Sequence, residues 1–182
     1  MYNVNAYFAS LQLTVTSVQK AKSGVFFGRP SSCEKEMIEL LKVLHSFGKN
    51  CAVLEKPAIG DICFAWYEEL WYRGRIIAVD KQVRTVELTD YGDVITIPFD
   101  YVGVISDDLK SEPITCFKWR FVNGTSPDLF PKGADEKIIL KPVQYDEELG
   151  GWIMTVNVSE NISNTPLGYF SFRNQDDNIF KK

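Results

Sequence analysis

The four cysteines and the single histidine are the side chains of this 182-residue chain that could hold a transition metal. They are spread widely along the sequence, at Cys33, His45, Cys51, Cys63 and Cys116, without a Cys-x-x-Cys pair. Structural zinc sites use cysteine and histidine ligands at short, characteristic spacings, and no such set can be assembled here. We therefore expect no zinc site and no cofactor.

The distribution of charge is the second chemical signal. The chain has 24 acidic residues against 20 lysines and arginines, for a net charge of -4. Residues 55–110 hold 11 acidic and 6 basic residues, so this stretch carries -5 and the remainder carries +1. An acidic surface attracts basic partners and does not provide the phosphate neutralisation that drives nucleic-acid binding. The sequence therefore favours a basic protein partner.

Hydropathy predicts a soluble, intracellular protein with no membrane contact. The composition is 45% hydrophobic and 24% charged, which is ordinary for a globular chain. No apolar run approaches the roughly 20 residues that a membrane helix needs. The first ten residues lack the basic start and the apolar stretch of a signal peptide.

The first third of the chain predicts two strands followed by one helix. Leu11, Leu13 and Val15 alternate with polar residues, and a second β-rich run precedes residue 29. Residues 31–48 then have helical periodicity, and Ser31 followed by Glu34 has the spacing of a capping box. The expected apolar stripe of this helix consists of Met37, Ile38, Leu41, Leu44 and Phe47.

Short β-rich runs separated by turn signals follow a linker near residue 56. The expected strands cover residues 62–67, 71–79, 85–89, 94–98 and 101–105, with the last one closing a small antiparallel barrel. Further strands are expected at residues 114–121, 137–143 and 151–158. Because neither outer third has enough strands for a closed sheet, we expect residues 1–55 and 109–173 to pair with each other around an inserted barrel at 56–108. Residues 174–182 are expected to form a frayed tail.

Three short motifs occur in a fixed order in the central stretch. They are Gly60 with Cys63 and Ala65, then Trp71-Tyr72-Arg73-Gly74, and then Asp90-Tyr91-Gly92-Asp93. In these residues the chain resembles a Tudor domain, whose barrels carry Gly-x-x-Cys-x-Ala, Trp-Tyr-Arg-Ala and Asp-Tyr-Gly-Asn in this order. The flanking elements resemble those of the extended Tudor domain. The resemblance implies a mainly β fold with one or two helices, in which a Tudor SH3-like barrel is inserted into an OB or staphylococcal-nuclease-like fold.

The resemblance implies a peptide-binding scaffold module rather than an enzyme. Extended Tudor domains bind arginine-containing tails of Piwi-class proteins, commonly with symmetric dimethylarginine, in the germline piRNA pathway that silences transposons. A methylated guanidinium is a flat, weakly hydrated cation, so aromatic rings within about 6 Å attract it by roughly 0.5 to 2 kcal/mol each. Tyr67, Tyr72 and Tyr91 match three positions of the family's aromatic cage. The resemblance also implies a cytoplasmic location, in perinuclear germ granules, and no small-molecule substrate.

Two positions depart from the family pattern. Leu88 stands where the family usually has a fourth ring, and Asp93 stands where it usually has the asparagine that hydrogen-bonds the guanidinium. The first hairpin is also short, so Trp66 is an alternative to Tyr67 for the first ring. We favour Tyr67, because strand alternation places it on one face with Cys63 and Ala65.

The neighbours of these site residues have simpler structural interpretations. Trp71 is expected in the core, because it points to the opposite face of the strand from Tyr72. Arg73 and Asp90 are expected to form a structural ion pair or to cap the turn, and Cys63 is expected to act as a small buried hydrophobe.

Other functions remain open. A nuclease would need a carboxylate cluster, yet residues 1–30 contain no acidic residue. A methylation-independent protein-interaction module is an alternative, as is single-stranded nucleic-acid binding through the OB-like part. The nucleic-acid interpretation would use Lys20, Lys22, Arg29, Lys118 and Arg120 with the rings of Phe26, Phe27 and Trp119.

Overall fold

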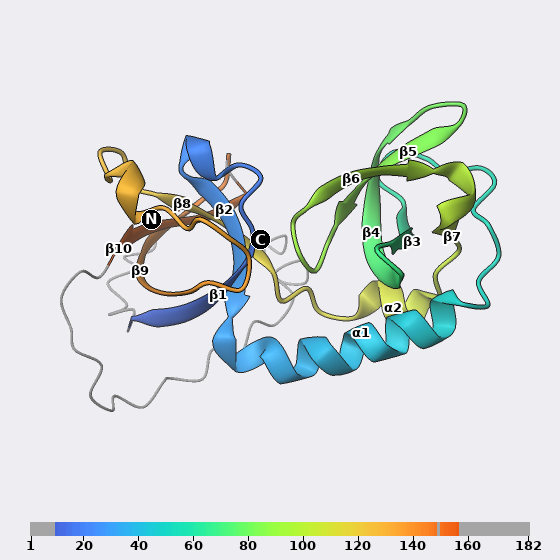
Figure 1. Ribbon diagram of the computed structural model, residues 1–182, viewed down its shortest axis with the longest axis horizontal. Coiled ribbons are helices and arrows are strands. Elements are labelled where there is room, and N and C mark those ends of the chain that lie inside the picture. Colours follow the sequence, from blue (N-terminus) through green and yellow to red (C-terminus); the bar gives the residue numbers. More distant parts are fainter. Residues whose placement is uncertain (1–9, 149, 157–182) are drawn as a thin grey trace, which may run out of the picture. The chain divides into compact units, whose positions relative to one another are not determined.

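A computed structural model describes residues 10–148 and 150–156 (Figure 1). The chain forms two compact units. One combines the two ends of the chain, up to Ser31 and from Phe117, and the other is the continuous segment Ser32–Cys116. The expected tail at residues 174–182 lies outside the described residues.

The unit built from the chain ends is a closed five-stranded barrel. Its strands are β1 (Leu11–Ser17), β2 (Val25–Pro30), β8 (Phe117–Phe121), β9 (Lys137–Asp146) and β10 (Gly151–Val156), in the order β1-β2-β8-β10-β9. Short 3-10 turns lie at Ala21–Ser23 and Pro127–Leu129. β2 pairs with β8 and β1 pairs with β9, both antiparallel. The expected pairing between the first and last thirds of the chain is therefore confirmed.

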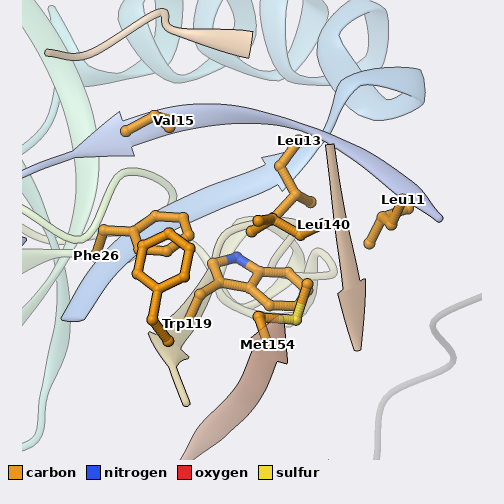
Figure 2. Packing of buried hydrophobic residues seen from close by; sticks show 8 residues of the cluster. Leu11, Leu13, Val15, Phe26, Trp119, Leu140 and Met154 are labelled. Atoms are coloured by element: carbon orange, nitrogen blue, oxygen red, sulfur yellow. The ribbon is translucent and has the colours of Figure 1, made fainter. Parts of the chain in front are cut away.

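The core of this barrel is built from residues that strand alternation directs inward. Leu13 and Val15 of β1 are fully buried, together with Phe26, Trp119 and Met154 from three other strands (Figure 2). The indole Nε1 of Trp119 donates a hydrogen bond to the carbonyl oxygen of Gly28 at 2.9 Å, which satisfies the one polar atom of this large side chain.

The second unit contains an antiparallel five-stranded sheet. Its strands are β3 (Ile62–Tyr67), β4 (Leu70–Val79), β5 (Val83–Leu88), β6 (Val94–Pro98) and β7 (Val102–Gly103), in the order β6-β5-β4-β3-β7. The first four match the expected strands to within two residues. The fifth was expected at residues 101–105 as the strand that closes the ring, and this was wrong. A 3-10 turn at Phe99–Tyr101 shortens it to two residues, which pair with β3 and leave β6 and β7 as sheet edges.

Helix α1 (Glu34–Gly48) packs against this sheet, but with a narrower apolar face than expected. Met37 and Leu44 are buried, whereas Ile38 and Phe47 are 55% and 62% exposed. These two side chains point away from the sheet, since only one arc of the helix meets it. Gly48 is buried against Trp71, and a Cβ atom at this position would collide with the indole ring. The expected capping box is absent, because a 3-10 turn at Ser31–Cys33 precedes the helix and no side chain caps it.

The short helix α2 (Asp107–Ser111) also belongs to the second unit. Arg73 of β4 donates hydrogen bonds from Nη1 to the carbonyl oxygens of Leu109 at 2.9 Å and Glu112 at 2.6 Å, around the end of this helix. The boundaries of the units therefore differ from the expected 55/56 and 108/109. They fall at 31/32 and 116/117, because both helices pack with the five-stranded sheet.

Candidate functional site

The register of the first hairpin places Tyr67 and Tyr72 on one face of the sheet. Residues directly opposite each other in neighbouring strands share a face, and Ala65 pairs with Tyr72 while Tyr67 pairs with Leu70. Ala65 and Cys63 on this face are fully buried in the core of the sheet. Burial raises the pKa of the Cys63 thiol to about 12, with a smaller contribution from Asp61, so it is a neutral buried group as expected. Tyr67 lies further along, at the exposed end of the strand.

Tyr91 lies in the turn between β5 and β6, and its side chain contacts Tyr72. Its ring meets the ring of Tyr72 edge to face, with centroids 5.4 Å apart and planes at 88°. The turn is fixed by hydrogen bonds from the backbone N–H groups of Tyr91 and Gly92 to the carbonyl oxygen of Leu88, at 3.1 and 2.7 Å. Gly92 has a φ of +87°, a conformation that suits glycine. Both rings pack partly against the core, which holds their orientation.

Two carboxylates share this end of the sheet with the tyrosines. A hydrogen bond with Glu68 raises the pKa of Tyr67, and the charge of Asp93 acts in the same direction. The pKa of Tyr72 is raised mainly by burial, with further contributions from Tyr91, Glu68, Tyr67 and Asp93. Negative charge nearby disfavours a tyrosinate, so the tyrosines remain neutral. The site therefore combines neutral aromatic rings with negative charge, an environment suited to an organic cation.

Leu88 and Asp93 stand on either side of the Tyr91 turn. Leu88 is buried in the core of the sheet, with Tyr72 and Tyr91 packed against the same cluster. It therefore supplies apolar support and no aromatic face. The backbone carbonyl oxygen of Asp93 accepts a hydrogen bond from the backbone N–H of Leu88 at 2.8 Å, which fixes the position of Asp93 at the start of β6.

Trp66 lies on the opposite face of the sheet. It pairs across the hairpin with Trp71, and their ring centroids are 5.3 Å apart. The ring of Trp66 also stacks on His45 of α1, with centroids 6.2 Å apart. The structure thus brings Tyr67, Tyr72, Tyr91 and Asp93 to one end of the sheet, with Leu88 beneath, and separates Trp66 from them. Trp71 packs towards α1, in agreement with its expected structural role.

Glu68 is the member of this group that sequence reasoning missed. Its signal is the pair Glu68-Glu69, which the sequence pattern indicates only as a turn between two strands.

The residues considered for nucleic-acid binding do not form a stacking surface. Phe26 and Trp119 are buried in the core of the closed barrel, and Arg29 is buried as well. Lys118 lies over the ring of Phe27 at 5.7 Å from its centroid, and Arg120 forms an ion pair with Asp146 at 2.6 Å. All three rings proposed for base stacking, including Phe27, are therefore buried in the structure.

The described part of the chain offers neither a metal-ligand cluster nor a membrane-spanning helix. In residues 10–148 and 150–156, no group of three or more His, Cys, Asp or Glu side chains is placed to hold a metal ion. Within the same ranges, no helix has the length and apolar character needed to cross a membrane.

Comparisons with known proteins identify relatives of this architecture. A family model described as "Tudor domain" matches residues 9–123. None of the curated proteins matches the chain by sequence. Among solved structures, the chain is similar to the extended Tudor domain of human TDRD1 in complex with a symmetrically dimethylated peptide. The two are 20% identical, with 85% of this chain and 80% of that chain covered and a TM-score of 0.68.

Two other similar structures have the same architecture. The extended Tudor domain of Drosophila melanogaster Tudor-SN is 17% identical, with 81% of this chain and 75% of that chain covered and a TM-score of 0.66. Extended Tudor domain TD3 of mouse TDRD1, in complex with a MILI peptide containing dimethylarginine, is 17% identical. The alignment covers 85% of this chain and 86% of the mouse chain, with a TM-score of 0.65. The predicted fold is therefore confirmed: a mainly β chain with the architecture of extended Tudor domains.

Proposed function

Because the chain belongs to the Tudor domain family, we propose that it is a binding module for arginine side chains in peptides, with or without symmetric dimethylation. The observation that carries this proposal is the meeting of Tyr67, Tyr72 and Tyr91 with two carboxylates at one end of the sheet. Aromatic faces attract a weakly hydrated guanidinium, and the carboxylates accept its N–H groups.

The geometry of the Tyr72 and Tyr91 rings suits a flat cation. Because the rings are almost perpendicular and 5.4 Å apart, they form two walls of a corner rather than a closed stack. A guanidinium lying flat against one wall would present its edge to the other, and its N–H groups, which lie in its own plane, would point sideways to the acidic side chains. Both rings pack against the buried cluster that contains Leu88, which supports them on the apolar side.

The proposed partner is the disordered, arginine-containing tail of a Piwi-class protein in transposon silencing. Two similar structures support this choice, one of mouse TDRD1 with a MILI peptide and one described as a complex of Tudor and Aubergine with a symmetrically dimethylated arginine. The excess of negative charge in residues 55–110 favours such a basic tail through long-range attraction. The corresponding location would be cytoplasmic germ granules, and the role would be that of a scaffold and not of an enzyme.

Calorimetry with matched peptides tests the proposal. Arginine-glycine and arginine-alanine tail peptides are titrated in unmodified and symmetrically dimethylated forms, with peptides carrying glutamine in place of arginine as controls. We expect saturable binding that requires the arginine. Binding that is equally strong with the glutamine peptides would show that the aromatic site does not recognise a guanidinium.

A further inference from the structure

The turn between β3 and β4 has an unusual backbone for its sequence. Tyr67 and Leu70 form the last pair of the hairpin, so Glu68 and Glu69 alone make the turn. Their φ angles are +45° and +64°, in the left-handed region that residues with a Cβ atom disfavour. Two-residue hairpin turns of this kind favour Asn-Gly or Gly-Gly. The chain therefore has two glutamates where backbone stability alone would select other residues.

This turn holds the Glu68 side chain at the edge of the aromatic site. Glu68 directly follows Tyr67, the last residue of β3, and it raises the pKa of the Tyr67 hydroxyl through a hydrogen bond and through its charge. The negative charge of Glu68 also raises the pKa of Tyr72 on the adjacent strand, β4. Asp93 acts on the same two tyrosines from the other hairpin, between β5 and β6. Acidic groups from two separate turns thus converge on the rings.

These two carboxylates lack a basic partner within the described part of the chain. The ion pairs found there join Lys42 with Glu39, Arg73 with Asp90, Lys110 with Asp107, and Arg120 with Asp146. Asp90 lies in the same turn as Asp93, yet it is fully paired with Arg73. Glu68 is exposed and Asp93 is half-buried, and among the described residues neither carboxylate has a basic neighbour beside the tyrosine rings, so an external cation can reach both.

We infer that Glu68 is a second acceptor for the bound guanidinium, held in place by a strained turn, and that it favours arginine with all its N–H groups intact. This inference rests on the proposed function and deepens it. An unmodified guanidinium has two N–H groups on each terminal nitrogen, whereas symmetric dimethylation leaves one on each. Two acceptors from two hairpins can use donors on both nitrogens, so each methyl group removes a donor that this site can engage.

A second role of Glu68 must be separated from the first. Its hydrogen bond could serve only to orient the ring of Tyr67. Glu68→Gln distinguishes the two roles, because the amide oxygen can still accept a hydrogen bond from the tyrosine hydroxyl while the negative charge is lost. Glu69→Gln is the matched control, since it removes the same charge from the neighbouring turn position.

The experiment measures dissociation constants of the full chain and these two variants for unmodified and symmetrically dimethylated arginine peptides. Glu68→Gln is expected to weaken binding of the unmodified peptide by about 5- to 20-fold and of the dimethylated peptide by less. Glu69→Gln is expected to stay within about twofold of wild type for both. Equal effects of the two variants, or an equal loss for both peptides with Glu68→Gln, would overturn the role of Glu68.

The outcomes also separate this inference from the proposed function. A wild-type chain that binds neither peptide contradicts the proposed function itself. Wild-type binding that persists unchanged in Glu68→Gln contradicts only the inference about Glu68.

The backbone strain supplies an independent test. The double variant Glu68→Asn with Glu69→Gly replaces the turn by Asn-Gly, and we expect it to raise the melting temperature by about 2 to 4 °C. We also expect it to weaken binding of the unmodified peptide as much as Glu68→Gln does. Glu69→Gly alone is expected to raise the melting temperature while keeping wild-type affinity. If the double variant binds as tightly as wild type, the acceptor role is wrong.

Discussion

The guanidinium of Arg73 and the carboxylate of Asp90 form a bidentate ion pair in which both side chains are almost fully buried. Nε donates to Oδ2 at 3.1 Å and Nη2 donates to Oδ1 at 2.6 Å, with side-chain exposures of 1% and 2%. Arg73 directly follows Tyr72, and Asp90 directly precedes Tyr91. The expected structural ion pair is therefore confirmed, and it joins the two backbone segments that carry the perpendicular rings.

Removing one partner of this pair should strongly destabilise the second unit. Asp90→Ala leaves the Arg73 charge buried without its carboxylate, and we expect a loss of about 3 to 5 kcal/mol in the free energy of unfolding. Urea denaturation measures it, with Asp100→Ala, an exposed acidic residue of the same sheet region, as the control. A change below about 1 kcal/mol for Asp90→Ala would mean that the pair contributes little to stability.

Substitution of Tyr72 or Tyr91, whose rings are in contact, should weaken peptide binding without preventing folding. Tyr72→Ala and Tyr91→Ala are each expected to weaken binding of an arginine peptide by roughly 1 to 2 kcal/mol, the scale of a cation-π contact, with the fold retained. Titration calorimetry together with circular dichroism checks both parts. Tyr101→Ala, which removes an exposed tyrosine outside the site, serves as the control and should bind normally.

Trp71→Ala should have the opposite profile to Tyr72→Ala, although the two residues are adjacent. The Trp71 ring packs between Phe64, Trp66 and Gly48, so its removal should lower the free energy of unfolding by about 3 kcal/mol. The exposed Ile77 on the same strand gives the matched control, Ile77→Ala. Stable Trp71→Ala protein with selectively lost peptide binding would show that the two faces of β4 have been assigned the wrong roles.

Methylation should matter less here than in a Tudor module with four aromatic rings. Leu88 offers no ring, and the carboxylate of Asp93 can accept hydrogen bonds from N–H donors that symmetric dimethylation removes. The methyl groups contribute about 1 kcal/mol through the tyrosines, and the lost donors offset part of it. We expect a preference for symmetric dimethylarginine below about tenfold, measured with matched peptides. A preference above about thirtyfold would contradict this interpretation of Leu88 and Asp93.

The sequence predicted those parts of the fold that depend on local alternation. Alternation along β3 placed Cys63, Ala65 and Tyr67 on one face, and the observed cross-strand pairs agree. The motif order also located Tyr72 and Tyr91, because residues around a tight hairpin are fixed by local geometry.

Features that depend on distant partners were less predictable. The exposure of Ile38 and Phe47 could not be predicted from helical spacing, since spacing defines a stripe but not the arc that meets the sheet. The position of Glu68 required the φ angles of its turn, which its sequence does not favour. The attachment of α1 and α2 to the central sheet followed from contacts of Trp71 and Arg73 that no local pattern encodes.

The interleaved strand order of the closed barrel has a consequence for how the protein is made. β1 and β2 leave the ribosome early, but their partners β9 and β8 are translated only after the whole of Ser32–Cys116. The middle segment holds all strands of its own sheet and can fold as soon as it is synthesised. Until β8 and β9 are synthesised, the outer edges of β1 and β2 remain unpaired, and unpaired strand edges are sites for aggregation. Vectorial synthesis therefore favours a folding order in which the unit Ser32–Cys116 forms first and the five-stranded closed barrel closes last.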